Sequence, residues 1–147
     1  MLSKTVIWSI AAAFICLAPP ALAQSATLGE ALDKGAKKLE KADLDALMSG
    51  SRYEGRSTSG TDRSWTHAAD GRLDAQARGA FANTSPRGTG TWRVSDDGQY
   101  CVDIAWGSAG KFPEKWCLHV FQQDGMYYGV RDAANRDAKP LVFNIRK

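Results

Sequence analysis

The chain has 147 residues, of which 44% are hydrophobic and 24% are charged, and its formal net charge is +3. This length is typical of one domain with one modest hydrophobic core. A net charge this small does not indicate binding to nucleic acid or to an anionic membrane surface. We therefore expect no nucleic-acid partner.

Residues 1–23 have the pattern of a secretory signal peptide. Lys4 supplies a positive charge, Thr5 to Leu17 is an almost unbroken apolar run, and Ala21-Leu22-Ala23 forms a cleavage site. The apolar run is shorter than the ~20 residues that a membrane-spanning helix needs. We expect cleavage after Ala23, no membrane span in the mature chain, and a periplasmic or secreted protein.

The mature chain keeps two of the three cysteines. Of the 19 Lys and Arg residues only Lys4 leaves with the signal, so 18 remain against 16 Asp and Glu. Cys16 leaves as well, and Cys101 and Cys117 remain. An even pair in an exported protein predicts a disulfide, and closing so short a loop stabilises a fold by roughly 3 kcal/mol.

Residues 24–50 have a polar, helical pattern. Gly35 lies in the middle of this segment and weakens its first half, whereas Asp43 to Met48 is the stronger helical stretch. Asp43 is a suitable N-cap and Gly50 a suitable C-terminal stop. The many lysines of the segment predict a solvated face rather than a binding surface.

From residue 51 to the end, apolar and polar residues alternate with a period of two. The clearest half-buried strand runs from Arg72 to Phe81. Turn signals such as Asp70-Gly71, Asp97-Gly98 and Asp124-Gly125 separate the alternating runs. The pattern predicts a mainly β domain over residues 51–147, with seven or eight antiparallel strands in a meander. Closure into a small barrel would hide the strand edges, and a two-sheet β-sandwich is the alternative.

The two cysteines predict a register between their strands. Facing Cys101 with Cys117 brings two further apolar pairs together, Tyr100–Leu118 and Val102–Trp116. Apolar residues then gather on the face opposite the sulfur atoms. We therefore predict a cross-strand disulfide on the more polar face of the sheet.

Several motifs occur in a fixed order along the mature chain. They are Leu44-x-x-Leu47-x-x-Gly50, Trp65 followed by Gly71, Gly90-x-Trp92, Asp97-Gly98-x-x-Cys101, and a second cysteine, Cys117, in an aromatic strand. In that order the motifs resemble a family of small exported bacterial proteins catalogued only as a domain of unknown function. The resemblance covers nearly the whole mature chain and implies export, a β-rich domain and a bacterial source. It implies no activity and no catalytic residues.

The sequence contains no established catalytic motif. His67 and His119 are its two histidines, and neither has a second metal ligand at a useful spacing on its own strand. The chain contains neither Gly-x-Ser-x-Gly nor His-Glu-x-x-His. We expect no enzyme, no cofactor and no metal site.

The large aromatic residues mostly share the parity of the inward-facing positions. One interpretation is that they fill the core, because large rings contribute most to core burial. The other is that they line a cup open at one end of a small barrel. The candidate cup residues are Trp65, Trp92, Tyr100, Trp106, Trp116 and Tyr128.

Three functional hypotheses follow. The first is a non-catalytic envelope protein that binds a small apolar ligand in the barrel mouth or an unidentified protein partner. The second is a secreted inhibitor or host-facing interaction protein that acts through the loops 82–88 and 107–115, because loops on a rigid scaffold carry function. The third is a hydrolase that uses His67 or His119.

Overall fold

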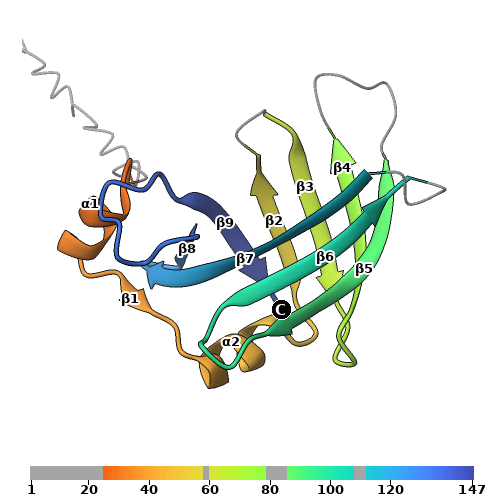
Figure 1. The fold of residues 1–147 in the computed structure, drawn as a ribbon, viewed down its shortest axis with the longest axis horizontal. Helices are drawn as coiled ribbons and strands as arrows, with labels where there is room; N and C mark the ends of the chain where they lie inside the picture. Colours follow the sequence, from red (N-terminus) through yellow and green to blue (C-terminus); the bar gives the residue numbers. More distant parts are fainter. Residues whose placement is uncertain (1–24, 58–59, 79–85, 108–111) are drawn as a thin grey trace, which may run out of the picture.

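The computed structural model describes residues 25–57, 60–78, 86–107 and 112–147 (Figure 1). The expected signal peptide and Phe81 lie outside the described residues, as does part of each proposed interaction loop. Two short helices and a two-residue strand come first, and eight longer strands follow. They are α1 (Leu28–Asp33), β1 (Lys37–Lys38), α2 (Lys41–Met48), β2 (Arg52–Arg56), β3 (Asp62–His67), β4 (Arg72–Arg78), β5 (Arg87–Val94), β6 (Tyr100–Trp106), β7 (Phe112–Gln123), β8 (Met126–Val130) and β9 (Leu141–Arg146).

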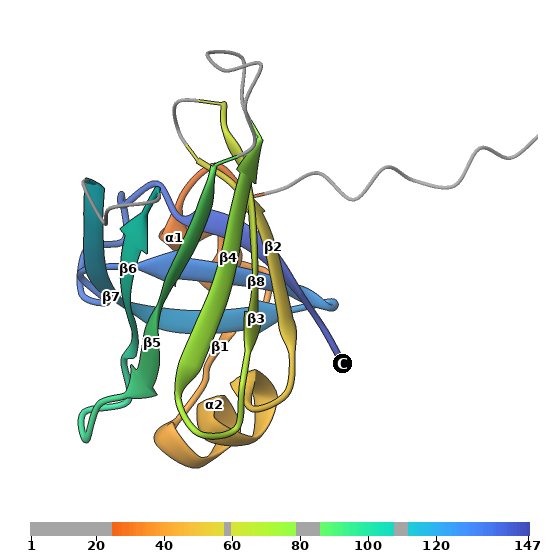
Figure 2. The same cartoon turned by 90° about the vertical axis from the view of Figure 1, so that its right-hand side faces the viewer.

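Strands β2 to β9 form a closed antiparallel barrel. Each strand pairs with the next along the chain, and β9 pairs with β2 to close the ring. The barrel form of the fold prediction is therefore confirmed, and the sandwich alternative is not. β1 is an additional strand that pairs with the end of β7, Lys37 opposite Gln122. Figure 2 shows β2 to β5 side by side, with α2 below them.

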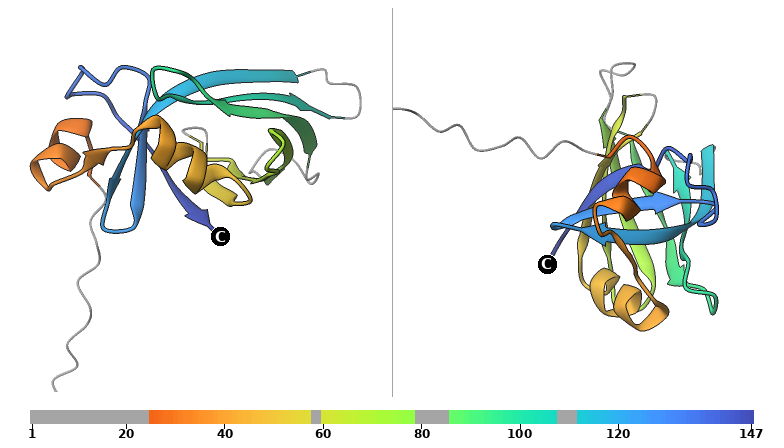
Figure 3. Two further views of the ribbon diagram at one scale, coloured as in Figure 1. Left: turned by 90° about the horizontal axis from the view of Figure 1, so that it is seen from below. Right: turned by 90° about the vertical axis from the view of Figure 1, so that its left-hand side faces the viewer.

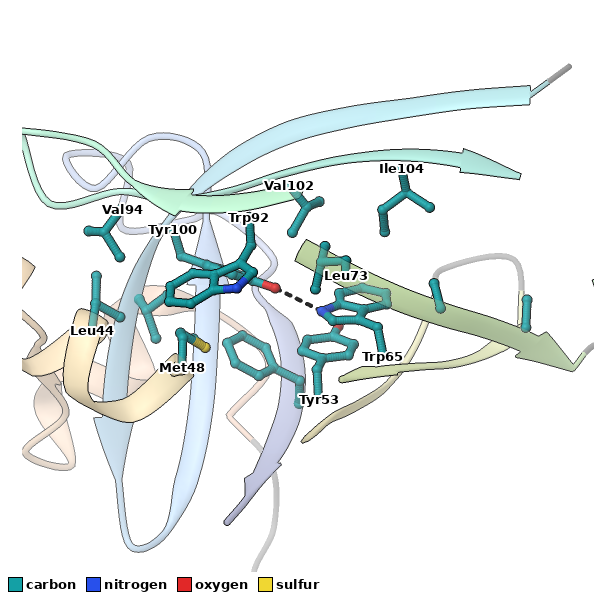
Figure 4. Packing of buried hydrophobic residues seen from close by; sticks show 14 of the residues in the cluster. Leu44, Met48, Tyr53, Trp65, Leu73, Trp92, Val94, Tyr100, Val102 and Ile104 are labelled. Atoms are coloured by element: carbon teal, nitrogen blue, oxygen red, sulfur yellow. Dashed lines mark hydrogen bonds between the residues drawn. The ribbon is translucent and has the colours of Figure 1, made fainter. Parts of the chain in front are cut away.

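Helix α2 covers one end of the barrel. Leu44 and Met48 are fully buried in the main core cluster and point into the barrel beside Trp92 and Tyr100 (Figure 4). The Lys147 Nζ donates to the carbonyl oxygens of Ala46 and Ser49 at 2.7 Å each. A cation at a helix C-terminus satisfies free carbonyls and interacts well with the helix dipole. We call this end the closed end, and the opposite end, where β2, β4, β6 and β8 finish, the mouth.

The ends of α2 differ partly from the prediction. The helix begins at Lys41 with Glu40 as its N-cap, so the predicted cap, Asp43, lies inside the first turn instead. An acidic side chain in the first turn also interacts favourably with the helix dipole. Asp43 therefore suits the first turn as well as the N-cap position. At the other end Gly50 has a φ of 69°, as expected of a residue that ends a helix.

The predicted disulfide and its register are confirmed. The two sulfur atoms of Cys101 and Cys117 are 2.02 Å apart, and the two residues are paired across β6 and β7. Their neighbours Asp103 and Lys115 lie on the same outer face and form an ion pair at 3.1 Å. The disulfide is therefore on the polar outside of the barrel, and buried residues such as Val102 are on the inside.

Strand β7 begins earlier than the sequence predicts. The expected loop 107–115 is shorter, because Pro113 and Lys115 already pair with Ala105 and Asp103 of β6. Proline usually marks a loop or an edge strand. Here β8 pairs with β7 only from His119 onward, so among the described residues the stretch 113–118 has a paired strand on one side only. Pro113 therefore occupies an edge, and the barrel wall is open beside it.

Helix α1 lies outside the barrel (Figure 3). Leu28 and Ala31 belong to a second buried cluster with Phe121, Tyr128 and Val130 of β7 and β8. The backbone N–H of Leu28 donates to the carbonyl oxygen of Ala138 at 2.9 Å. This contact attaches α1 to the segment 131–140, which leads from β8 to β9 along the mouth. No helix in the described part of the chain is long and apolar enough to cross a bilayer.

Candidate ligand-binding site

A cleft of about 930 Å³ opens at the mouth of the barrel. It lies between the open edge of β7, strands β2 and β3, and the segment 131–140. Its inner wall consists of Tyr53, Arg63, Trp65, Glu114, Trp116 and Leu118. Its rim includes Arg56, Arg131, Asp132, Asn135 and Lys139. A cleft of this size is within the range of small-molecule sites, which is ~300–1,000 Å³.

Stacked rings form the floor of the cleft. The rings of Tyr53 and Trp65 are parallel within 1°, with centroids 3.9 Å apart, and Trp116 lies 6.0 Å from Trp65. Gly55 makes room for this arrangement, because a Cβ atom there would lie 2.4 Å from the Tyr53 hydroxyl. The missing side chain of Gly55 therefore allows Tyr53 to lie flat across its own strand.

A carboxylate lies among the rings. Glu114 accepts hydrogen bonds from the indole N–H of Trp106 at 2.8 Å and of Trp116 at 2.9 Å, and it forms an ion pair with Arg63. Side-chain exposure is 19% for Glu114 and 28% for Arg63, so the pair is only partly open to solvent. Both oxygens of Glu114 therefore have charged or indole donors.

Arg63 has donor capacity left over. Its guanidinium carbon lies 5.9 Å from the ring centroid of Trp106, within the range of a cation–π contact. Its Nε atom is buried and has no hydrogen-bond partner among the described residues. The Glu114 carboxylate thus accepts from three donors, whereas Arg63 has a buried N–H without an acceptor among the described residues.

Burial keeps the phenol of Tyr53 neutral. Desolvation raises the pKa of Tyr53 above its ordinary value of 10.0, against a smaller lowering by the positive charge of Arg63. Glu114 adds a small further rise. Tyr53 therefore contributes an uncharged hydroxyl to the floor of the cleft.

A buried hydrogen-bond chain lies between the floor and the closed end. Trp65 Nε1 lies 2.8 Å from the Tyr100 hydroxyl, which lies 2.8 Å from Nε2 of His67 (Figure 4 shows the first contact). Because an indole N–H only donates, the Tyr100 hydroxyl accepts a hydrogen bond from Trp65 and donates one to Nε2 of His67. The proton of His67 is then on Nδ1, 3.1 Å from the carbonyl oxygen of Ser51.

His67 is therefore a core residue with both ring nitrogens in use. Its side chain is fully buried, and desolvation lowers its pKa from 6.5 to about 4, so the ring is neutral at pH 7. His119, the other candidate base, is half-buried, and its Nε2 lies 3.1 Å from the side-chain nitrogen of Gln99. Among the described residues no group of three or more His, Cys, Asp or Glu could hold a metal ion.

The six candidate cup residues occupy different places. Trp65 and Trp116 line the cleft. Trp106 donates a hydrogen bond to Glu114, which also lines the cleft. Tyr100 and Trp92 lie deeper, and Trp92 donates to the carbonyl oxygen of Ala68 at 2.8 Å. Tyr128 does not join them, because it belongs to the outer cluster beneath α1.

The two charged residues of the inner wall, Arg63 and Glu114, are not among the residues predicted from the sequence. Arg63 and Glu114 stand two positions before Trp65 and Trp116, and two residues along a strand share a face. The alternation that placed the two tryptophans inside therefore also placed Arg63 and Glu114 inside. They were overlooked because a charged residue is usually assigned to the outside of a strand.

A comparison with protein families gives one match over most of the chain. The matching family model is described as "Protein of unknown function (DUF995)" and covers residues 14–144. No curated protein and no solved structure matches the chain.

Proposed function

This chain belongs to the DUF995 family of proteins of unknown function, and we propose that it is a non-catalytic binding protein of the bacterial envelope. In this proposal the cleft at the barrel mouth takes a small, largely apolar ligand. The observation that carries the proposal is the ring-lined floor at the bottom of an open cleft of about 930 Å³. Apolar walls with a few convergent polar groups are typical of small-molecule sites.

Export is part of this proposal and is supported by two features. Residues 1–23 have the pattern of a signal peptide. The cysteines that remain after its removal stand at bonding distance, and disulfides persist in oxidising compartments such as the periplasm.

A binding role fits the chemistry of the site better than hydrolysis does. A general base must reach the proton that it removes. Both ring nitrogens of His67 are hydrogen-bonded inside the core, and the side chain has no exposed surface. Among the described residues that line the cleft there is no histidine. Its inner carboxylate, Glu114, is held by three donors, and its other acid, Asp132, lies on the rim.

The direct test is binding of a neutral fluorescent probe, N-phenyl-1-naphthylamine, to the purified protein. We expect saturable binding at one site. Leu141 is half-buried and lines the cleft. The variant Leu141→Trp places a bulky ring there and should weaken probe binding at least about tenfold. The matched control is Thr89→Trp, on the exposed outer face of β5. Absence of saturable binding, or equal binding by the two variants, would contradict the proposal.

Native mass spectrometry of protein recovered from the periplasm tests the same proposal in the cell. A mass that starts at Gln24 would show that the signal is cleaved. Extra mass in the native spectrum that disappears on denaturation would identify a carried ligand.

A protein partner is the second candidate, and the open edge of β7 favours it. At Lys115 and Cys117, strand β7 has β6 as its neighbour on one side. On its other side no strand is paired with it among the described residues. An extended peptide can add to such an edge as a further strand. Such a partner would slow hydrogen exchange of the Lys115 and Cys117 amides, whereas a ligand in the cleft alone would not.

A further inference from the structure

The rim of the cleft carries an excess of positive charge. Among the described residues the rim has three cations (Arg56, Arg131 and Lys139) against one acid, Asp132. Arg131 and Lys139 form no ion pair and no side-chain hydrogen bond with the described residues. Arg56 has only an exposed partner, Asp62, at 3.7 Å. The rim therefore has two cations outside any ion pair of the described residues, Arg131 and Lys139, against one such acid, Asp132.

The interior of the cleft does not suit a cationic ligand. An aromatic box with a carboxylate can bind a quaternary ammonium group. Here Arg63 already lies over Trp106, and Glu114 already accepts from Arg63 and from two indoles. A ligand cation would have to displace the cation that belongs to the protein.

Polarity is thus ordered along the depth of the cleft. The rings of Tyr53, Trp65 and Trp116 lie at the bottom, and Leu118 and Leu141 lie along the wall. The two cations without an ion-pair partner among the described residues, Arg131 and Lys139, lie at the rim. A ligand that matches this order has an apolar chain and an anionic group at one end.

We propose that the ligand of the cleft is a single-chain amphiphile with an anionic head, whose chain lies against the half-buried Trp116 and Leu141 and whose head lies between Arg131 and Lys139. This inference rests on the proposed function and specifies its ligand class. The shared chemistry of the head is a negative charge with oxygen acceptors, as in a long-chain carboxylate or a monoalkyl phosphate.

The test compares four compounds with the same twelve-carbon chain: dodecanoate, dodecyl phosphate, dodecanol and dodecyltrimethylammonium. Affinities for the purified full chain are measured by calorimetry at low ionic strength, below the concentrations at which micelles form. We expect both anions to bind at least about tenfold more tightly than the alcohol, and the cation to bind most weakly. A preference between the two anions would identify the head group as carboxylate or phosphate. Added salt should reduce the advantage of the anions, because the rim is exposed to solvent.

The other outcomes overturn the inference in distinguishable ways. If dodecanol binds as tightly as the anions, the anionic head is wrong, while the proposed apolar site stands. Tightest binding of the cation would mean that the aromatic box, and not the rim, selects the ligand. If none of the four compounds binds, both the inference and the proposed function fail.

Charge reversal at the rim locates the head group. In Arg131→Glu/Lys139→Glu, the affinity for dodecanoate should fall at least about tenfold, and that for dodecanol should be unchanged. The matched control is Arg93→Glu/Lys37→Glu, which changes the net charge equally at exposed positions on β5 and β1. Equal losses of dodecanoate affinity in the two double variants would contradict a head-group site between Arg131 and Lys139.

Discussion

Arg63 and Glu114 form an ion pair across the inside of the barrel, although 51 positions separate them in the chain. The pair joins β3 to β7, two strands that are not neighbours in the sheet. Among the described residues β7 has no paired strand on its open side at this level, so the ion pair connects the free edge to the opposite wall. The same two residues therefore hold the cleft together and give its floor a polar centre.

Removal of Glu114 should destabilise the barrel. In Glu114→Ala the Arg63 guanidinium and two indole N–H groups lose their shared acceptor in a partly buried place. We expect a loss of about 2 kcal/mol in the free energy of unfolding, measured by urea denaturation. Glu114→Gln keeps an acceptor oxygen without the charge and should lose less. Equal stabilities of Glu114→Ala and the wild type would mean that solvent replaces the carboxylate at no cost.

The buried histidine makes stability depend on pH. The pKa of His67 is about 4 in the folded chain, below the ordinary histidine value of 6.5, because burial disfavours the charged ring. Between these values the unfolded chain binds the proton and the folded chain does not. The contribution of His67 is therefore complete above pH 6.5 and is lost as the pH falls toward 4, by about 3 kcal/mol in all.

Urea denaturation at several pH values between 7 and 4 measures this dependence. In His67→Asn the slope over this range should be smaller than in the wild type. His119→Asn is the matched comparison, since it removes the other histidine, which lies on the outer face with Cys117. A wild-type slope that survives in His67→Asn would assign the pH dependence to other groups.

The strand register of the barrel could be predicted from the sequence more completely than the residues of the cleft could. Alternation and the cysteine pair identify which face of β6 and β7 is inside, because a disulfide fixes which residues are opposite each other. Parity alone does not identify whether Tyr128 lies on the inner or the outer face of β8. It lies on β8 with apolar neighbours on both faces, and α1 covers the outer one. A helix that packs on the outside of a strand makes both faces apolar, so the alternation that marks the interior disappears.

The open side of the barrel has only one ambiguous signal in the sequence. It exists because β8 is short and β7 is long, with five residues against twelve, so β7 extends beyond its partner. Strand ends are the least predictable part of a fold. Pro113 is the one residue that indicates an edge, and it is equally typical of a loop.

The disulfide should contribute to stability through the unfolded chain. The bond joins residues 16 positions apart, and closing a loop of this length removes entropy from the unfolded state worth about 3 kcal/mol. Cys101→Ala/Cys117→Ala should lose about this amount in urea denaturation. The wild type in reducing agent should match the double variant, and reducing agent should leave the variant unchanged. The bond lies on the outside of the barrel, so probe binding in the cleft should persist without it.

The glycine beneath Tyr53 offers a way to reshape the floor of the cleft. A Cβ atom at Gly55 would lie 2.4 Å from the Tyr53 hydroxyl, and the stacked ring of Trp65 limits how far Tyr53 can move away. We expect Gly55→Ala to lower the free energy of unfolding by about 1–3 kcal/mol, as overpacking typically does. In a Tyr53→Ala background the same substitution should cost much less, because the atom that it meets is gone. A double-mutant cycle in urea measures the difference, and a cost of Gly55→Ala that is equal in both backgrounds would place its cause in the backbone of β2 instead.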